Sequence, residues 1–423
     1  MKRYYGSQQN VTKPVEKITL DDRSVSKKRI FFIALFLCIG IGAFVYAFTH
    51  LGGEEKGWQK VTLDKVVDES SYFDFTLSYE FGKTKKSVKR EKNALSEAYK
   101  SLCREAYILF DRTTEYDGMG NLCTVNRHPN ETVTVEPALY KAFETYAFYS
   151  TNRLLYLNAL TEHVEALVSS DSDEALSEYD PYTTDSVREF FNKTAEFAMN
   201  PESVQLELCG DNRVILHVSQ EYITFAKEND IANFIDFGWM KNAFICDFLA
   251  DSLIEKGFRN GILTSSDGFT RNFCESTEDF SYTLVFYEDG AARNAGTMNY
   301  QGKMNFVWLH DYPVNTFDRM SRVLMLPDGN RRHTYIGRDG MPKSARHDLL
   351  VWSPGWPCAN LAISAANSYI SDEIDLSYFL KDCGYWDMNA LFFEDGMIHT
   401  SDWSVTFINT SMTVVKHPVA GAE

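Results

Sequence analysis

The stretch DFGWMKNAFICDFLADSLIEKGFRN, residues 236–260, predicts a strand end, a glycine turn and then a helix over 241–256. A further strand is expected at NGILTSS, residues 260–266. A turn that opens a helix toward a phosphate usually carries small residues, because the ligand must approach bare backbone N–H groups. Here that position holds four larger residues, Trp239, Met240, Lys241 and Asn242. The stretch therefore has the outline of a ligand-binding turn and side chains that would narrow it.

Sequence patterns predict further helices and strands along the chain. Helices are expected over 93–110, from Pro137 onward and over 359–370. Runs typical of strands occupy 72–82, 132–135, 204–208, 213–218, 233–238, 282–288 and 304–309. The two kinds of element follow one another without a regular strand–helix–strand repeat. The predicted class is therefore α+β, with mixed sheets flanked by helices.

Three polar segments are expected to lie outside regular structure. Residues 83–92, KTKKSVKREK, predict a solvated basic stretch, and residues 111–126 predict a loop. Residues 169–185, SSDSDEALSEYDPYTTD, are rich in acids and serine and predict a loop or insertion. Their carboxylates lack the ordered spacing and the glycine of a calcium-binding loop, so no calcium site is expected there.

Residues 30–48, IFFIALFLCIGIGAFVYAF, contain no charge and as a helix would span roughly 28 Å, about one hydrocarbon core. The tail before them, residues 1–29, has a net charge of +5, and basic flanks stay on the cytoplasmic side. We therefore predict a single-pass signal anchor in the cell membrane, a stalk over 49–70 and an extracytoplasmic domain over 71–423. A cleaved signal peptide would need a small-x-small pattern after the run, and none follows it. A lipoprotein would need a small residue before Cys38, where the sequence has Leu37. Both alternatives are therefore weaker than the anchor.

Charge and cysteine content exclude several other classes. The whole chain has a formal net charge of −17 and the tail has +5, so the remainder carries −22. Such an acidic surface repels phosphate backbones, and no nucleic-acid partner is expected. Seven cysteines lie outside the apolar run, widely spaced and without a CxxC pair. Buried thiols with at most a few disulfides are expected rather than a zinc site or a disulfide framework.

Common catalytic motifs do not account for this sequence. The DFG at 236–238 matches three letters of the kinase metal-binding motif, but no HRD-type loop precedes it. The chain has no GxxxxGK[ST], no GxSxG, no HExxH and no GxGxxG after a strand. The pairs His310-Asp311 and His347-Asp348 could bind a metal, but no second pair lies at helical spacing. Surface or core histidines are the expected interpretation.

Four spaced segments together resemble the flavin transferases of the ApbE type, which move FMN from FAD onto a Ser or Thr of a partner protein. In that family a strand ends in Asp-Leu-Gly-Gly, and a second Asp follows eleven residues after the first; Asp236, Gly238 and Asp247 keep this spacing. The family element His-Ile-Ile-Asp-Pro-x-Thr-Gly-x-Pro is similar to HTYIGRDGMP, which begins at His333. The element Ala-Asp-Ala-Leu-x-Thr-Ala is similar to the segment that begins at Ala359. The resemblance covers most of residues 71–400 and implies an ApbE-like fold.

A fourth segment and the implied site residues complete the resemblance. FDRTTEYDGMGNLCTVN, residues 110–126, looks like the first flavin loop of the family. The resemblance implies candidate catalytic residues Asp236 and Lys241, and FAD-binding residues Tyr116, Asp236, Asn242 and His333. It also implies that Mg²⁺ would be held by the side chains of Asn360 and Ser364, together with a carbonyl near Trp239.

The departures from the family pattern fall on the implied cofactor contacts. Asn360 stands where the family has an Asp, and Ser364 stands where it has a Thr. A neutral amide oxygen loses the carboxylate's charge, so Mg²⁺ affinity is expected to fall. Trp239 replaces the second Gly of the turn, and Asn242 replaces its Lys.

Three functional hypotheses therefore remain open. The first is a membrane-anchored FAD:protein FMN transferase that acts with Mg²⁺ on an acceptor protein carrying a Ser/Thr motif. The second is a protein of the same fold that binds a flavin or a partner protein without transfer. The third is a surface scaffold or interaction protein with an empty cleft.

Overall fold

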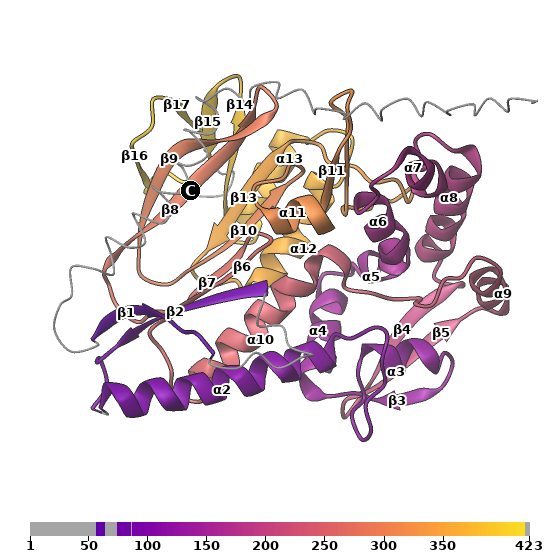
Figure 1. Cartoon of the computed structure of the whole chain (residues 1–423), viewed down its shortest axis with the longest axis horizontal. Helices are drawn as coiled ribbons and strands as arrows, with labels where there is room; N and C mark the ends of the chain where they lie inside the picture. The colour runs from indigo at the N-terminus through magenta and orange to yellow at the C-terminus, as the bar shows by residue number, and fades with distance from the viewer. Residues whose placement is uncertain (1–55, 64–73, 86, 419–423) are drawn as a thin grey trace, which may run out of the picture. The chain divides into compact units, whose positions relative to one another are not determined.

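The computed structural model describes residues 56–63, 74–85 and 87–418 (Figure 1). They belong to one folded unit, Glu55–Glu423. The predicted tail at 1–29 and the predicted membrane span at 30–48 lie outside the described residues. Among the helices that the structure describes, none is both long and apolar enough to cross a membrane.

A nine-stranded sheet forms the centre of the unit, in the order β1-β2-β6-β7-β10-β13-β14-β15-β17. Its strands are β1 (Gly57–Lys60), β2 (Phe75–Phe81), β6 (Gly261–Ser265), β7 (Phe269–Asn272), β10 (Met304–His310), β13 (Asp348–Ser353), β14 (Asn389–Glu394), β15 (Met397–Thr400) and β17 (Thr413–Lys416). Neighbouring strands pair antiparallel except β15 and β17, which pair parallel. β1 lies within the predicted stalk, so this part of the stalk belongs to the sheet.

Three smaller sheets and a set of helices complete the unit. The small sheets are β3-β5-β4 (Thr132–Thr134, Arg213–Val218, Val204–Gly210), β16-β9-β8 (Thr406–Ile408, Ala291–Gln301, Asp279–Glu288) and β11-β12 (Val323–Met325, Arg331–His333). The helices are α2 (Val88–Leu109), α3 (Leu122–Arg127), α4 (Pro137–Phe148), α5 (Arg153–Leu157), η2 (Asn158–Leu160), α6 (Thr161–Val168), α7 (Asp173–Tyr179), α8 (Asp185–Met199), α9 (Gln220–Glu228), η3 (Gly238–Met240), α10 (Lys241–Glu255), α11 (Thr316–Ser321), α12 (Cys358–Tyr369) and α13 (Leu376–Tyr385).

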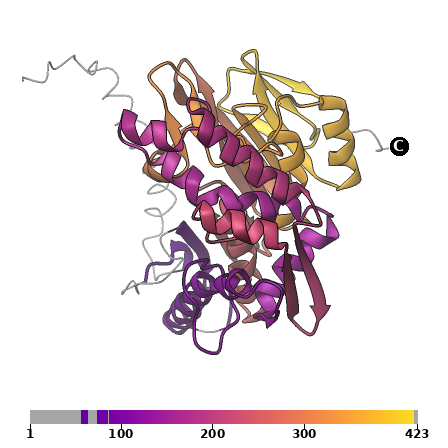
Figure 2. The same ribbon diagram turned by 90° about the vertical axis from the view of Figure 1, so that its right-hand side faces the viewer.

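The middle strands of the central sheet are buried on both faces, and the alternation of their side chains divides the core in two. On β10, Val307 and Leu309 join the larger core beneath α10 and α12, whereas Phe306 joins a second core beneath the β8–β9 ribbon. On β13, Val351 and Trp352 divide in the same way. Successive side chains of a strand point to opposite faces, so a strand covered on both sides is apolar at nearly every position. In Figure 2 the magenta and rose helices stand in front of the orange strands.

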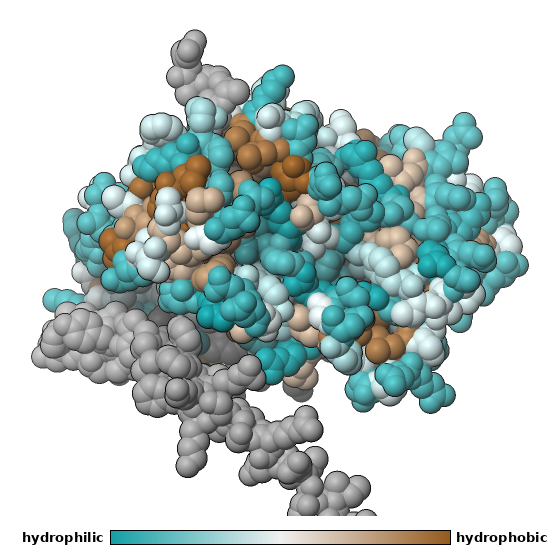
Figure 3. Space-filling view, turned by 90° about the horizontal axis from the view of Figure 1, so that it is seen from above, coloured by the Kyte–Doolittle hydropathy of each residue, from teal (hydrophilic) through white to brown (hydrophobic). Residues whose placement is uncertain are grey.

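The visible outer surface agrees with the acidic, polar composition of the chain. Seen from above, it is mostly hydrophilic, with separate apolar areas (Figure 3). The seven described cysteines are free thiols, and all but Cys209 are buried. The expectation of buried thiols is thus confirmed for six of the seven cysteines.

Most predicted elements are confirmed, including the α+β class and the helices at 137, 241–256 and 359–370. The strand predicted over 233–238 is wrong, because this segment has no strand partner. The backbone N–H groups of Phe234 and Ile235 instead donate to Asn126 Oδ1 at 2.9 and 3.0 Å, and Asn126 Nδ2 donates to the Ile235 carbonyl at 2.9 Å. One side chain therefore supplies the hydrogen bonds that a neighbouring strand would have made.

Two predicted polar segments are partly helical. The acidic segment 169–185 contains α7, whose first turn is capped by Ser172, since the backbone N–H of Ala175 donates to Ser172 Oγ at 3.2 Å. The cap and the acids of the first turn stabilise a helix N-terminus, a signal that was present in the sequence. The basic segment 83–92 likewise contains the start of α2 at Val88.

Candidate functional site

The turn at Gly238 is held in place by contacts on both sides. Gly238 has a φ of +51°, and a Cβ added there would lie 2.7 Å from Asn158 Cγ. Asn158 Nδ2 donates to the Asp236 carbonyl at 3.1 Å, and the Gly238 N–H donates to Asp236 Oδ1 at 3.1 Å. Only glycine meets both demands, a left-handed φ and close approach of a neighbour. The turn therefore presents the start of α10 at one defined angle.

The Asp236 carboxylate is buried and forms an ion pair with Arg112. Arg112 Nη1 lies 2.8 Å from Asp236 Oδ2, and the same guanidinium contacts Glu165 at 2.5 Å and Glu162 at 3.4 Å. Burial alone would lower the pKa of Arg112, but the charges of Asp236 and Glu165 raise it above its usual value. Asp236, predicted to be catalytic, is thus linked through Arg112 to Glu165 of α6, and the ion pairs hold α6 and the loop after α2 against the turn.

A cavity of about 310 Å³, called here the turn cavity, opens beside η3 and the start of α10. Its polar or aromatic lining residues include Asp74, Thr161, Glu165, Trp239, Lys241, Asn242, Asp267, Arg322 and Thr334. The structure thus brings together three of the residues predicted from the sequence, Trp239, Lys241 and Asn242.

Trp239 forms a wall of the turn cavity and keeps most of its ring out of solvent. Only 7% of its surface is exposed, and its ring meets the Tyr335 ring edge-on at 5.1 Å. Tyr335 in turn contacts Tyr369 at 5.0 Å. The indole is therefore held by an aromatic stack inside the core rather than standing across the entrance to the turn.

Several buried polar atoms around the turn cavity have no hydrogen-bond partner among the residues that the structure describes. They are Thr161 Oγ1, Asn242 Oδ1, Asp267 Oδ1, Arg322 Nε and Thr334 Oγ1. In the side chains of Asn242 and Asp267, only one polar atom each has a hydrogen-bond partner: Asn242 Nδ2 donates to Asp267 Oδ2 at 3.0 Å. Folded proteins leave few buried polar groups unsatisfied, so five around one cavity indicate a polar ligand or ordered water.

Charge in the turn cavity is mixed. Burial raises the pKa of Asp74 above its ordinary value, although nearby Lys241 opposes the shift. Burial also raises the pKa of Asp267, against the charge of Arg322. Arg322 is held by Asp318 at 3.0 Å and by the Tyr335 hydroxyl at 2.8 Å. Lys241 and Arg322 are therefore the cations available to a phosphate in this cavity.

Of the four residues predicted to bind FAD, only Asn242 lines the turn cavity; Asp236 holds the turn beside it, and His333 and Tyr116 make other contacts. His333 is buried, its Nδ1 accepts a hydrogen bond from the Tyr335 N–H at 3.4 Å, and burial lowers its pKa to about 4. Its neighbour Thr334 lines the cavity instead. Tyr116 lies in the loop after α2, and its hydroxyl donates to Asp111 Oδ2 at 2.8 Å.

The residues predicted to bind a metal lie beside two different cavities or contacts. Asn360 Nδ2 donates to the Tyr149 hydroxyl at 3.1 Å, and burial raises the pKa of this hydroxyl whereas Asn360 and Ser364 both lower it. The Tyr149 ring packs on Trp386 at 4.8 Å, which fixes the hydroxyl beside Asn360. Trp239 lines the turn cavity, whereas Asn360 lines a different cavity.

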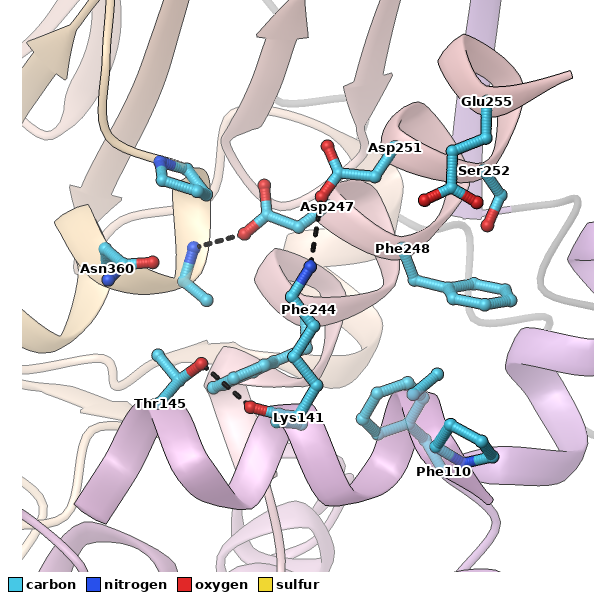
Figure 4. Close-up of a pocket in the computed structure, with 15 residues that line it drawn as sticks. Phe110, Lys141, Thr145, Phe244, Asp247, Phe248, Asp251, Ser252, Glu255 and Asn360 are labelled. Atoms are coloured by element: carbon cyan, nitrogen blue, oxygen red, sulfur yellow. Dashed lines mark hydrogen bonds and ion pairs between the residues drawn. The ribbon is translucent and has the colours of Figure 1, made fainter. Parts of the chain in front are cut away.

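That second cavity, also of about 310 Å³, lies between α4, α10 and the start of α12 (Figure 4). Asn360 enters it from α12, opposite Thr145 and Lys141 of α4. Asp247 accepts from the Cys358 and Ala359 N–H groups at 2.9 and 2.8 Å, so it caps α12. Among the described residues, no group of three or more His, Cys, Asp or Glu side chains is placed to hold a metal. Asn360 and Ser364 themselves offer only neutral oxygens, which bind Mg²⁺ more weakly than carboxylates do.

Sequence reasoning missed the contribution of α6 to the site. Thr161 and Glu165 line the turn cavity from this helix, and Glu165 also contacts Arg112. Thr161 and Glu165 are four residues apart, which places them on one face of a helix. A helix prediction over 161–168 would therefore have indicated that these two polar side chains point the same way.

Comparison with known proteins relates this architecture to one fold. No family model matches the sequence, and no curated protein matches it. The ApbE protein of Thermotoga maritima has a similar structure, with a TM-score of 0.54 and 12% identity over 84% of this chain and 97% of that chain. The flavin transferase ApbE of Vibrio cholerae and the apo flavinyl transferase ApbE of Pseudomonas stutzeri give TM-scores of 0.48 at 13% and 11% identity. These cover 80% and 82% of this chain and 93% of each of those chains. The chain has a divergent form of the ApbE fold.

Proposed function

We propose that this protein binds a flavin nucleotide, with FAD as the expected form, in the turn cavity. The observation that carries the proposal is the group of buried, unpartnered polar atoms around a cavity that opens at the start of α10. Asn242 and Asp267 offer acceptors to a flavin or adenine edge, and Lys241 and Arg322 offer positive charge to its phosphates. The ApbE-like fold and the sequence resemblance to flavin transferases support the same ligand.

Transfer of FMN to a partner protein is the second candidate function, and the pair Asp74 and Lys241 favours it. Both line the turn cavity, and burial raises the pKa of Asp74 above its ordinary value, which makes this carboxylate a better proton acceptor. The hydroxyl oxygen of an acceptor Ser or Thr would attack the FMN phosphorus, and the bond to the AMP oxygen would break. Asp74 would take the hydroxyl proton, and the ammonium of Lys241 would stabilise the charge on the phosphates.

The place of action follows from the N-terminal sequence. In this proposal residues 30–48 anchor the protein by a single span in the cell membrane, and the flavin cavity lies on the extracytoplasmic side. An acceptor protein would then have to present its Ser/Thr motif on that side.

Direct titration of the full-length protein with FAD, followed by flavin fluorescence, tests the binding proposal. Asn242→Leu removes the cavity amide and is expected to weaken FAD binding about tenfold, the effect of losing a buried hydrogen bond. Asn192→Leu, on the exposed side of α8, is the matched control and should leave binding unchanged. Equal affinity of Asn242→Leu and the unchanged protein would exclude the turn cavity.

Transfer is tested separately, by mass spectrometry of an acceptor peptide after incubation with the protein and FAD. Covalent FMN on the peptide with release of AMP supports transfer, and Asp74→Asn should then slow the reaction without weakening FAD binding. FAD binding without labelled peptide supports the binding function alone.

A further inference from the structure

A third cavity, called here the arginine cavity, shares no lining residue with the turn cavity. It measures about 250 Å³ and is formed by residues of β8, β12, β13 and β14, by Asp311 after β10 and by the segment before β13. Its polar and aromatic lining includes Tyr287, Asp311, Arg331, Ser344, Arg346, His347 and Asp348. None of them was assigned a role by the sequence resemblance.

Two arginine side chains of this cavity are stacked on aromatic rings. The guanidinium carbon of Arg331 lies 5.1 Å from the centre of the Tyr287 ring, and that of Arg346 lies 4.4 Å from the centre of the Phe392 ring. Stacking fixes the plane of a guanidinium and leaves its N–H groups pointing along that plane. Such preorganised forks match the two oxygens of a carboxylate or phosphate.

The hydrogen bonds of Arg346 are incomplete. Its Nη1 donates to the partly exposed Glu394 at 2.9 Å, whereas its buried Nε has no partner in the described part of the chain. A buried charged donor without an acceptor is costly, so this atom marks a place where an acceptor is missing.

Two carboxyl groups line the arginine cavity, Asp311 and Asp348, and their negative charge is largely offset or neutralised. Asp311 is buried and accepts from Ser344 Oγ at 2.7 Å and from His347 Nδ1 at 3.3 Å, and Arg331 Nε lies 3.5 Å away. Its charge is thus balanced by its own donors. Burial and the charge of Asp311 raise the pKa of the second carboxyl, Asp348, to about 7, so it is partly neutral at physiological pH.

We propose that the arginine cavity is a separate binding site for a small oxyanion, a phosphate or carboxylate group, held by the guanidinium groups of Arg331 and Arg346. Arg346 exchanges part of its contact with Glu394 for the ligand, and the unpartnered Nε gains an acceptor. Ser344 and His347 stand at the rim and complete the polar lining. The proposal does not rest on flavin binding, because the two cavities share no lining residue.

Calorimetric titration of the full-length protein with sodium sulfate and with sodium succinate, at matched ionic strength, tests this proposal. Sulfate has a constant charge near neutral pH and represents the tetrahedral oxyanion, whereas succinate represents the carboxylate. Arg346→Met is expected to weaken binding of the preferred probe about tenfold, as for loss of a charged hydrogen bond. Arg293→Met, an exposed arginine paired with Asp289 and outside the cavity, is the matched control and should bind as the unchanged protein does.

Two further variants separate a binding role from a merely structural one. Glu394→Gln frees Arg346 and is expected to tighten binding several-fold, a gain that damage to the fold would not produce. Binding of sulfate should also tighten as the pH falls from 8 to 6, because the carboxyl of Asp348 becomes neutral and an imidazole in the lining, His347, can gain a proton in this range. Asp348→Asn should therefore reduce this dependence, and the double variant Asp348→Asn, His347→Gln should remove it. The other groups that face Asp348 are Asp311, Tyr312 and Arg346.

The outcomes decide the proposal in either direction. Saturable binding that Arg346→Met weakens and Glu394→Gln strengthens supports it, and the preferred probe identifies the phosphate or the carboxylate as the ligand group. No saturable binding of either probe, an equal loss in Arg293→Met, or weaker binding in Glu394→Gln overturns it.

Discussion

Arg112 Nη1 and Asp236 Oδ2 lie 2.8 Å apart, and this ion pair joins the loop after α2 to the turn before α10. Asp236 is 2% exposed, so its charge has little access to water and depends on Arg112. The pair therefore fixes the turn on which the turn cavity depends.

Removal of the arginine should destabilise the protein strongly. Arg112→Met leaves the buried carboxylate of Asp236 without its counter-charge, which typically costs about 3 kcal/mol of the free energy of unfolding. Denaturation by urea measures the loss. Arg127→Met breaks the exposed pair with Glu115 and should change the free energy by less than about 1 kcal/mol. Equal effects of the two variants would show that the Asp236 pair has no special structural role.

Alanine at Gly238 should cost more than alanine at another left-handed glycine. Gly257 has a φ of +89° with nothing within 4 Å of an added Cβ, so Gly257→Ala carries only the backbone cost, about 1 kcal/mol. Gly238→Ala adds a clash with Asn158 and should lose about 3 kcal/mol. Thermal and urea denaturation of the two variants give the comparison, and a difference near zero would refute the close approach.

Magnesium should leave the thermal stability of the unchanged protein the same, because Asn360 is a neutral amide that is already hydrogen-bonded to the Tyr149 hydroxyl. The double variant Tyr149→Phe, Asn360→Asp removes the hydroxyl and restores a carboxylate, so Mg²⁺ should then raise the melting temperature. Tyr149→Phe alone is the control. A rise with Mg²⁺ in the unchanged protein would contradict the assignment of Tyr149.

His333 should make the protein less stable in mild acid. Its folded-state pKa of about 4 lies below the ordinary value of 6.5, so the unfolded chain binds the proton more readily. Stability is therefore lost as the pH falls from about 6.5 toward 4, by up to about 3 kcal/mol. His333→Asn keeps an acceptor for the Tyr335 N–H and should flatten this slope in urea denaturation, whatever its constant effect on stability. An unchanged slope would place the titration elsewhere.

Asp348 should make the protein less stable as the pH rises, the opposite of the effect expected from His333. Its folded-state pKa of about 7 lies above the ordinary value of 3.8, so its stabilising contribution is present at low pH and is lost as the pH rises through 7. Asp348→Asn, which cannot ionise, should be more stable than the unchanged protein at pH 8, by up to about 4 kcal/mol, and similar to it near pH 4. Urea denaturation at both pH values measures this, and a destabilised variant at pH 8 would contradict the raised pKa.

The periodic spacing of apolar residues was sufficient to predict many of the helices and strands. The helices at 241–256 and 359–370 and the strands at 213–218 and 304–309 were predicted because their apolar residues or flanking signals lie within one element. The segment 233–238 has the composition of a strand, but composition does not show whether a strand lies beside it. Its actual partner, Asn126, is 108 residues from Phe234 in the sequence.

In the candidate site, too, some features could be predicted from the sequence and others depend on the tertiary structure. The sequence by itself determined the α+β class, the glycine turn and the presence of Trp239, Lys241 and Asn242 at the start of α10. Only the tertiary structure decided that the Trp239 ring packs on Tyr335 and that the hydroxyl of Tyr149, 211 residues from Asn360, accepts a hydrogen bond from this expected metal ligand. The physical reason is that helix and strand patterns depend on neighbours a few residues apart, whereas the direction of a side chain in the core depends on which distant segments pack against it.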